Sequence, residues 1–452
     1  MRRWRARRRR HAPGGAARSW LVGIPACAAL LATGTAAQAG WSEPLTLEHT
    51  VTAAAGNAQG AEAFMWPVAT PDELHRGVST LGGSYLQAQL RLPDGRLTSP
   101  RSISPTSDTA ARARGIALDA NGTATAVWTQ TTRAAPGRVA IMVSARRAGI
   151  PPFRKAVEIG RAAFGDDVKL AVAANGAAMI VRSNGASITA YYRPAAACVA
   201  SPRGCFGPAQ TIVDCRLRPR EVSRGCGGPI DVTFGPRNRV YVTWQDRLVV
   251  MHGGRFAPPL VIPIGGGFPP KLAALPDGSA VLAWLTRSAR GLTLVKTAVS
   301  DPDGRRLSTP QTVSAPWLAG WEDCTNLQLR ANHQGETTLV WECLPASRPA
   351  HRMLASAVRR PGAAFEAGTV VSPAASDATR AALAVDSRGN TILVYSYDGG
   401  IVASVRQPRH GFAAPVLVAR GEPSHVLEAG DKVTVAWPGL RPNTTVLSDW
   451  VP

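Results

Sequence analysis

Aromatic and acidic residues stand side by side in one inserted stretch of the sequence. Trp317 and Trp321 fall there, and Glu322 and Asp323 directly follow the second tryptophan. A tryptophan ring offers a flat apolar face and an N–H donor, whereas a carboxylate accepts hydrogen bonds from hydroxyl and amide groups. Together they suit contact with a carbohydrate or a peptide. The alternative is a loop that packs against its neighbour.

Two further stretches carry polar side chains that could contact a ligand. One holds Asp72, Glu73 and His75, and the other holds four arginines between residues 216 and 224. Arginines in such a group could hold an anion through paired N–H donors. For both stretches the alternative is a solvated surface. The candidate ligand-binding residues are Trp317, Trp321, Asp323, Arg220, Arg224 and His75.

Recognised catalytic motifs are absent from the sequence, which has no Gly-x-Ser-x-Gly, His-Glu-x-x-His or P-loop pattern. Asp119, Asp277 and Asp386 recur with a turn, so we expect them to cap it rather than act as acids or calcium ligands. Residues 301–304 resemble part of a calcium loop but lack the further ligands. We therefore expect no metal and no cofactor. A carboxylate pair for glycoside hydrolysis is a three-dimensional property, so the catalytic residues, if any, stay unknown.

One phrase recurs along the chain, and its most regular copy is residues 381–395. An apolar run leads to a polar turn with Gly389, and a second apolar run ends in Tyr395. This pattern predicts a β-hairpin. In eight copies the aromatic position follows the turn position by six residues: Gly60 and Trp66, Gly122 and Trp128, Gly176 and Arg182, Asn238 and Trp244, Gly278 and Trp284, Gly335 and Trp341, Gly389 and Tyr395, and Asp431 and Trp437.

Three copies depart from the phrase, two at the turn position and one at the aromatic position. Asn238 and Asp431 replace the turn glycine, and we expect them there because Asn and Asp tolerate the left-handed conformation. Arg182 is the one departure at the aromatic position.

Each copy is followed by two more strand-like runs. The third runs include residues 85–91, 139–144, 292–296 and 401–405. The fourth runs open with Phe, as in residues 153–159, 206–213, 256–262, 365–371 and 412–418. Four short antiparallel strands, repeated, are typical of β-propeller blades. The sequence therefore predicts an all-β protein with a single propeller domain, whose fixed-position aromatics form the core between blades.

The two ends of the chain predict how the ring closes. Residues 41–47 read as a fourth strand with no blade before it, and residues 446–450 as a third strand with no fourth after it. Pairing them would complete an eighth blade and leave no open edge. Seven blades is the alternative, because the first and last copies are the least regular.

Insertions are expected on one face of this propeller. The turns between first and second strands are short throughout, whereas long connections fall at residues 67–83, 214–228, 315–323 and 344–351. Strand alternation places these four connections on the same face, which we call the loop-rich face. Binding commonly resides in loops on a rigid scaffold, so ligand binding is expected there.

Six of the seven cysteines lie outside the N-terminal segment: Cys198, Cys205, Cys215, Cys226, Cys324 and Cys343. Fifteen disulfide connectivities are open, and pairing between sequence neighbours is the most economical. On that basis Cys215 and Cys226 would staple the long loop on the loop-rich face, and Cys198 and Cys205 would close a loop on the opposite face. Cys324 and Cys343 are symmetric about the turn at residues 333–334, which predicts that they face each other across the hairpin. A metal site is the poorer interpretation, because no Cys-x-x-Cys spacing occurs.

The phrase resembles that of NHL-type propellers and, more loosely, of secreted sialidase-like propellers. The resemblance is carried by residues 115–122 and 383–390 and is at the level of the fold. The Asp box of sialidases is not matched, because the aromatic stands six residues after Gly rather than three. An inherited sialidase activity is correspondingly less well supported.

The first 39 residues predict a signal peptide, which would be followed by a propeller domain over residues 40–452. A basic N-terminal part precedes an apolar run from Trp20 to Ala32, and residues 37–39 supply a small-x-small cleavage pattern. Alternatives are an uncleaved anchor, a lipid at Cys27 and the twin-arginine route. Without this segment the chain keeps 43 basic and 30 acidic residues, a net charge of +13.

These features predict a secreted or extracellular protein, with association with a cell wall as one option. We expect a monomer that serves as a binding or scaffold module for a glycan, a cell-wall polymer, a peptide or another protein through the loop-rich face. No nucleic-acid-binding motif is present, and after cleavage no segment is long enough to span a membrane. The alternative is a sialidase-like glycoside hydrolase or lyase.

Overall fold

The computed structural model describes residues 40–69, 85–105, 109–132, 135–149, 153–163, 165–195, 205–215, 226–265, 268–289, 291–314, 321–345, 351–373 and 377–452. These residues form strands β1 to β34 and one short 3-10 helix, η2 (Pro236–Asn238). No helix in the described ranges is long and apolar enough to cross a membrane.

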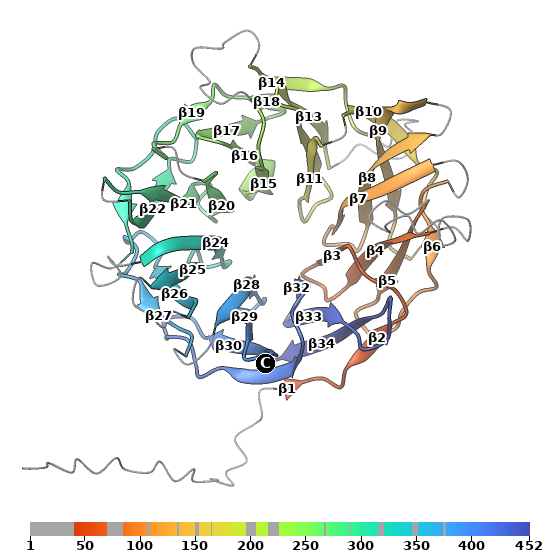
Figure 1. The fold of residues 1–452 in the computed structure, drawn as a ribbon. Coiled ribbons are helices and arrows are strands. Elements are labelled where there is room, and N and C mark those ends of the chain that lie inside the picture. Colours follow the sequence, from red (N-terminus) through yellow and green to blue (C-terminus); the bar gives the residue numbers. More distant parts are fainter. Residues whose placement is uncertain are drawn as a thin grey trace, which may run out of the picture. The chain divides into compact units, whose positions relative to one another are not determined.

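The described strands form eight antiparallel sheets arranged in a ring, so the fold is an eight-bladed β-propeller (Figure 1). Blade 1 comprises β3 (Ala53–Gly56), β4 (Glu62–Val68), β5 (Tyr85–Arg91) and β6 (Arg101–Ser102). Blade 2 comprises β7 (Thr109–Leu118), β8 (Ala124–Thr132), β9 (Ala135–Arg146) and β10 (Val157–Ala162). Blade 3 comprises β11 (Asp167–Val172), β12 (Ala178–Ser183), β13 (Ser187–Arg193) and β14 (Gln210–Asp214).

Blade 4 comprises β15 (Ile230–Phe234), β16 (Val240–Trp244), β17 (Arg247–His252), β18 (Arg255–Phe256) and β19 (Leu260–Val261). Blade 5 comprises β20 (Lys271–Ala274), β21 (Ala280–Arg287), β22 (Thr293–Ser300) and β23 (Gln311–Thr312). Blade 6 comprises β24 (Trp321–Ala331), β25 (Thr337–Pro345), β26 (Met353–Arg359) and β27 (Thr369–Val370). Blade 7 comprises β28 (Ala378–Val385), β29 (Thr391–Tyr397), β30 (Gly400–Arg406) and β31 (Val416–Arg420).

Blade 8 is built from both ends of the described chain. Its first three strands are β32 (His425–Ala429), β33 (Lys432–Pro438) and β34 (Thr445–Val451), and its outer position is taken by β1 (Gly40–Trp41) and β2 (Leu45–Leu47). Leu45 pairs with Leu447, and Gly40 pairs with Val451. The predicted closure is confirmed, and with it eight blades rather than seven.

The hydrophobic core lies between the blades. Each cluster of buried apolar side chains joins two neighbouring blades; for example, Trp284 of blade 5 packs with Leu248 and Val250 of blade 4. The repeated aromatics occupy these interfaces as predicted, and their exposed fractions are at most 6%: Trp66, Trp128, Trp244, Trp284, Trp341, Tyr395 and Trp437. The inter-blade interfaces therefore fix the scaffold.

Blade 3 replaces the repeated aromatic with Arg182. Its Nε lies 3.8 Å from an oxygen of Asp166, and its guanidinium donates to the carbonyl of Arg161. Tyr191 of β13, only 3% exposed, belongs instead to the core between blades 2 and 3. A tyrosine from the third strand thus supplies the apolar bulk that the second strand lacks.

The turn aspartates cap their turns, as expected. Asp119 Oδ1 accepts from the Thr123 amide at 2.8 Å, Asp277 Oδ1 from the Ser279 amide at 2.8 Å, and Asp386 Oδ1 from the Asn390 amide at 2.8 Å. Asn238 is left-handed with φ 59°, as predicted. The expectation for Asp431 is wrong: Gly430 takes the positive φ of 67°, because only two residues separate the paired Ala429 and Lys432.

The outer strands begin later than the Phe-led runs predict. β10 begins at Val157 rather than at Phe153, and β27 begins at Thr369 rather than at Phe365. Phe153 is 8% exposed and Phe365 is 5% exposed. The phenylalanine therefore inserts into the core first, and regular pairing starts after it.

Two of the predicted disulfides are present in the described residues. Cys215 bonds to Cys226 with a Cα–Cα distance of 5.8 Å, and Cys324 bonds to Cys343 with a Cα–Cα distance of 4.1 Å. Cys205 is disulfide-bonded as well. Its predicted partner, Cys198, lies outside the described residues.

Candidate ligand-binding cavity

The six candidate residues chosen from the sequence fall in different parts of the chain. His75, Arg220, Arg224 and Trp317 lie outside the described residues. Trp321 and Asp323 do not lie in a loop, as their composition suggested, but begin β24, where Trp321 pairs with Pro345 and Asp323 with Leu344. Only the backbone of these two residues is described.

A cavity of about 250 Å³ lies where three blades meet at the ring centre, on the loop-rich face. Its lining comes from the starts of β15 and β20 and from the first half of β24. These three strands follow one another along the inner edge of the ring (Figure 1). Its lining residues are Pro229, Ile230, Asp231, Phe268, Pro269, Pro270, Lys271, Leu285, Thr325, Asn326 and Leu327. The disulfide loop that ends at Cys226 and the insertion at residues 315–320 both lead into these strands. The candidate loops therefore adjoin the cavity along the chain.

One wall of the cavity is an exposed aromatic ring. Phe268 is 59% exposed, although aromatic residues at the repeated positions are buried. Its backbone amide donates to the carbonyl of Leu285 at 3.2 Å. Two prolines, Pro269 and Pro270, follow and restrict the backbone up to Lys271, where β20 begins. The ring is thus presented to solvent on a stiff connection.

The same cavity is lined by the carboxyl group of Asp231 and the ammonium group of Lys271. Burial raises the pKa of Asp231, and Lys271 and Arg330 partly offset this effect. Asp231 Oδ1 also accepts a hydrogen bond from the backbone amide of Val232 at 3.1 Å. Lys271 is exposed. The cavity can therefore offer one hydrogen-bond acceptor and one cationic donor to a ligand.

Asn326 shapes the third wall through a bulge. It adopts a positive φ of 45°, and the register between β24 and β25 shifts between Thr325 and Gln328. Its amide nitrogen donates to Glu342 and to the carbonyl of Ala381 in blade 7, and its Oδ1 accepts from Gln328 at 2.8 Å. A non-glycine residue at positive φ persists only where its surroundings hold it. This network therefore fixes the cavity wall and ties blade 6 to blade 7.

The cavity combines apolar walls with few convergent polar groups, which is typical of small-ligand sites. Sequence reasoning missed Phe268, Asp231 and Lys271, because none of them belongs to a long insertion or a known motif. One signal was present: Phe268 is followed by two prolines directly before an inner strand, which no other copy shows. The described lining contains one carboxylate, that of Asp231.

Comparisons with known proteins give structural similarity only. No family model matches the sequence, and no curated protein matches it. Among solved structures, polysaccharide lyase Uly1 aligns over 91% of this chain and 99% of its own, with 10% identity and a TM-score of 0.49. A protein from Lactobacillus plantarum aligns over 80% and 97%, with 15% identity and a TM-score of 0.45. An α-L-arabinanase of Penicillium chrysogenum, complexed with arabinobiose, aligns over 74% and 91%, with 11% identity and a TM-score of 0.36.

Proposed function

We propose that the protein is an exported binding propeller that holds a carbohydrate chain at the cavity between blades 4, 5 and 6. The exposed ring of Phe268 would pack against the apolar face of a sugar. Asp231 would accept hydrogen bonds from sugar hydroxyls, and Lys271 would donate to hydroxyl or acidic groups. The disulfide-stapled loop and the insertion before β24 would extend this contact along the chain.

One observation carries the proposal: Phe268 is a large aromatic side chain exposed beside a cavity that contains polar groups. Exposing an aromatic ring at a concave site is unfavourable unless a ligand covers it, since burial of its apolar area stabilises the covered state. Other large exposed apolar side chains, such as Leu417 on the outer strand β31, do not line this cavity. The cavity therefore has the composition of a recognition site.

Titration calorimetry with a panel of neutral and acidic oligosaccharides tests this function. For the panel members that bind, F268A is expected to weaken binding about tenfold or more, because interface energy concentrates on central aromatic anchors. Leu417→Ala is the matched control, since Leu417 is 66% exposed but lies on an outer strand. Equal affinities for the wild type and F268A would contradict the proposal that this cavity binds the carbohydrate.

The hydrolase or lyase alternative stays a prediction. A two-carboxylate mechanism needs a second acid on the other side of the scissile bond. Asp231 supplies one carboxyl whose pKa is raised by burial, a state suited to a general acid. The binding function needs only the groups already described in the cavity.

A further inference from the structure

The third strand of most blades ends in an arginine. Arg91, Arg146, Arg193, Arg359 and Arg406 each pair in register with the first residue of their blade's second strand. This end of the blade carries the tight turns between first and second strands, and we call it the turn face. The arginines therefore recur at one structural position, between a blade and the turn of the preceding blade.

Between blades 6 and 7 this arginine is neutralised. Arg406 is 1% exposed, and its two terminal nitrogens donate to Glu336 Oε1 at 2.7 and 2.6 Å. Glu336 directly follows the turn glycine of blade 6, and its backbone amide donates to Asn332 Oδ1 at 2.9 Å. A buried charge is thus compensated by a carboxylate from the neighbouring turn.

Between blades 2 and 3 the same position lacks the carboxylate. The turn is the same, since the Thr123 amide donates to Asp119 Oδ1 at 2.8 Å, but Thr123 stands where Glu336 stands in blade 6. Arg193, 5% exposed, takes the place of Arg406. In the described chain its guanidinium bonds to neutral oxygens, the carbonyl of Gly176 at 3.0 Å and the hydroxyl of Thr125 at 3.0 Å.

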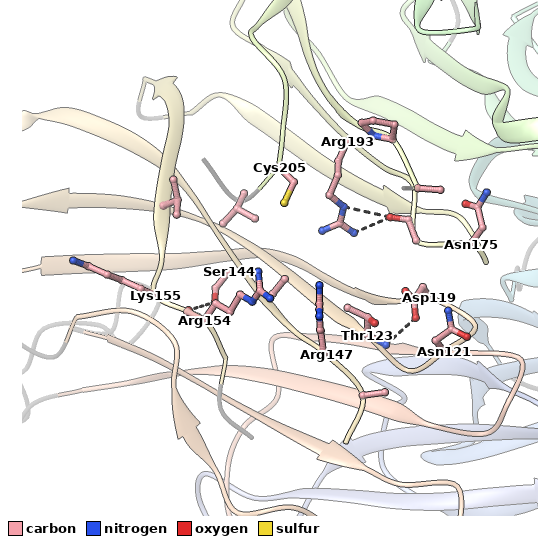
Figure 2. Close-up of a pocket in the computed structure, with 17 residues that line it drawn as sticks. Asp119, Asn121, Thr123, Ser144, Arg147, Arg154, Lys155, Asn175, Arg193 and Cys205 are labelled. Atoms are coloured by element: carbon pink, nitrogen blue, oxygen red, sulfur yellow. Dashed lines mark hydrogen bonds between the residues drawn. The ribbon is translucent and has the colours of Figure 1, made fainter. Parts of the chain in front are cut away.

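A pocket of about 420 Å³ opens beside Arg193 on the turn face. Figure 2 shows Arg147, Arg154 and Lys155 of blade 2 along one side, with Arg193 and Cys205 of blade 3 on the other. Four cationic side chains and one carboxylate, that of Asp119, therefore line it. The Asp119 carboxylate is 6% exposed and is engaged in its turn. The lining thus carries a net positive charge, part of it buried.

Burial lowers the pKa of Arg193, and the negative charge of Asp119 offsets part of this effect. Arg193 also lies over the ring of Phe206, with its guanidinium carbon 5.3 Å from the ring centroid. These contacts hold the side chain in place without a direct carboxylate partner. A fixed guanidinium of this kind is suited to bind an oxyanion.

We propose that this pocket is a second binding site, which takes the carboxylate or sulfate group of an acidic sugar. The anion occupies the place that Glu336 fills in the equivalent site between blades 6 and 7. Arg193 binds it at the base of the pocket, and Arg154 binds it from the exposed side. Asn121, Asn175 and the backbone of the two turns line the far end, where sugar hydroxyls find donors and acceptors.

The size of the pocket favours a sugar over a free ion. About 420 Å³ falls within the range of roughly 300–1,000 Å³ that is typical of small-molecule sites. An inorganic ion alone would leave the amide groups of Asn121 and Asn175 without a ligand contact. The site lies on the face opposite to the cavity that contains Phe268, so the two sites bind independently.

The test is T123E, which restores the missing carboxylate next to Arg193. Calorimetry with a galacturonate trisaccharide as the probe is expected to show wild-type binding at this site and about tenfold or greater weakening in T123E, because the internal carboxylate competes for Arg193. Ser279→Glu is the matched control: it adds the same charge after the turn glycine of blade 5, away from the pocket. It is expected to keep wild-type affinity.

A second variant keeps the test valid if T123E does not fold. R154A changes an exposed side chain, so the fold is retained, and a severalfold loss of affinity is expected. F268A is expected to leave this binding unchanged, which separates the site from the cavity on the loop-rich face. Wild-type affinity in both T123E and R154A would overturn the proposal. Equal binding of a neutral galactose trisaccharide, or of inorganic sulfate, would also overturn it.

Discussion

At the scale of single residues, two buried arginines on the turn face have different roles. Arg406 has a structural role, whereas we propose a binding role for Arg193. Arg406 and Arg193 occupy the same position in different blades, but only Arg406 donates hydrogen bonds directly to a carboxylate. Arg91 is neutralised too, at 2.8 Å from Asp449. A buried charge without its partner is costly. For Arg406 an internal carboxylate supplies that partner, and for Arg193 we propose that an external anion does.

The Arg406–Glu336 pair gives a direct stability prediction. Glu336→Gln leaves the buried guanidinium without its counter-charge, so the free energy of unfolding is expected to fall by about 3–5 kcal/mol. Chemical denaturation measures this change. Asp94→Asn is the control: Asp94 pairs with Arg96 at 2.6 Å, but both side chains are at least half exposed. A much smaller change is expected there, because solvent screens an exposed ion pair. Equal effects of the two substitutions would contradict the distinction.

At the scale of elements, the connection from β2 to β3 joins blade 8 to blade 1, and two histidines lie at this seam: His49 within the connection and His425 at the start of β32. His49 stacks on Trp66 with ring centroids 4.3 Å apart, and His425 Nε2 lies 3.3 Å from the carbonyl oxygen of Val51. Burial lowers the pKa of both histidines, with smaller opposing effects of Glu48 on His49 and of the Val51 hydrogen bond on His425. Both histidines are therefore harder to protonate in the folded seam than in the unfolded chain.

This arrangement predicts loss of stability in acid. The unfolded chain takes up protons at the ordinary histidine pKa of 6.5, whereas the folded seam resists protonation to lower pH. The unfolded state then binds more protons, so the free energy of unfolding falls as the pH drops below about 6.5. Denaturation of wild type and His425→Asn between pH 8 and pH 5 measures it. The variant is expected to show a weaker pH dependence, and an identical dependence would contradict this role of His425.

Much of the element-level structure could be predicted from the sequence, because the hairpin phrase repeats with a constant offset. Blade architecture, ring closure and the buried aromatics followed from that repetition. Pairing of Cys324 with Cys343 was also predicted, from symmetry about residues 333–334. The structure centres the turn on Gln334, between the paired Ala331 and Thr337, and the bulge after Thr325 shifts the register back by one residue. The symmetry of the sequence predicts neither the displaced centre of the turn nor the shift in register at the bulge.

The candidate sites were less predictable for a physical reason. Phe268, Asp231 and Asn326 come from three blades and meet only after the ring closes. The role proposed for Arg193 depends on Thr123 of the preceding blade, where a carboxylate is missing. A single repeat of the sequence does not show that these two positions are neighbours. Sequence reasoning instead favoured the long insertions, several of which lie outside the described residues. Aligning the last residue of each third strand would have revealed the arginine series.

At the scale of the whole molecule, the two proposed sites use opposite faces of one rigid ring. The cavity with Phe268 lies at the ring centre on the loop-rich face, and the pocket with Arg193 lies between blades 2 and 3 on the turn face. Linked sites on one protein raise the apparent affinity for a polymer only if the polymer can reach both. A net charge of +13 without the N-terminal segment adds a general attraction for acidic polymers at low salt.

The central claim is that the cavity between blades 4, 5 and 6 binds carbohydrate. Hydrogen exchange with mass spectrometry, recorded with and without a binding oligosaccharide from the calorimetric panel, tests it most directly. We predict that protection from exchange will appear in peptides that span residues 226–231, 268–272 and 321–327. Protection that spares all three segments while the oligosaccharide is bound would contradict the claim.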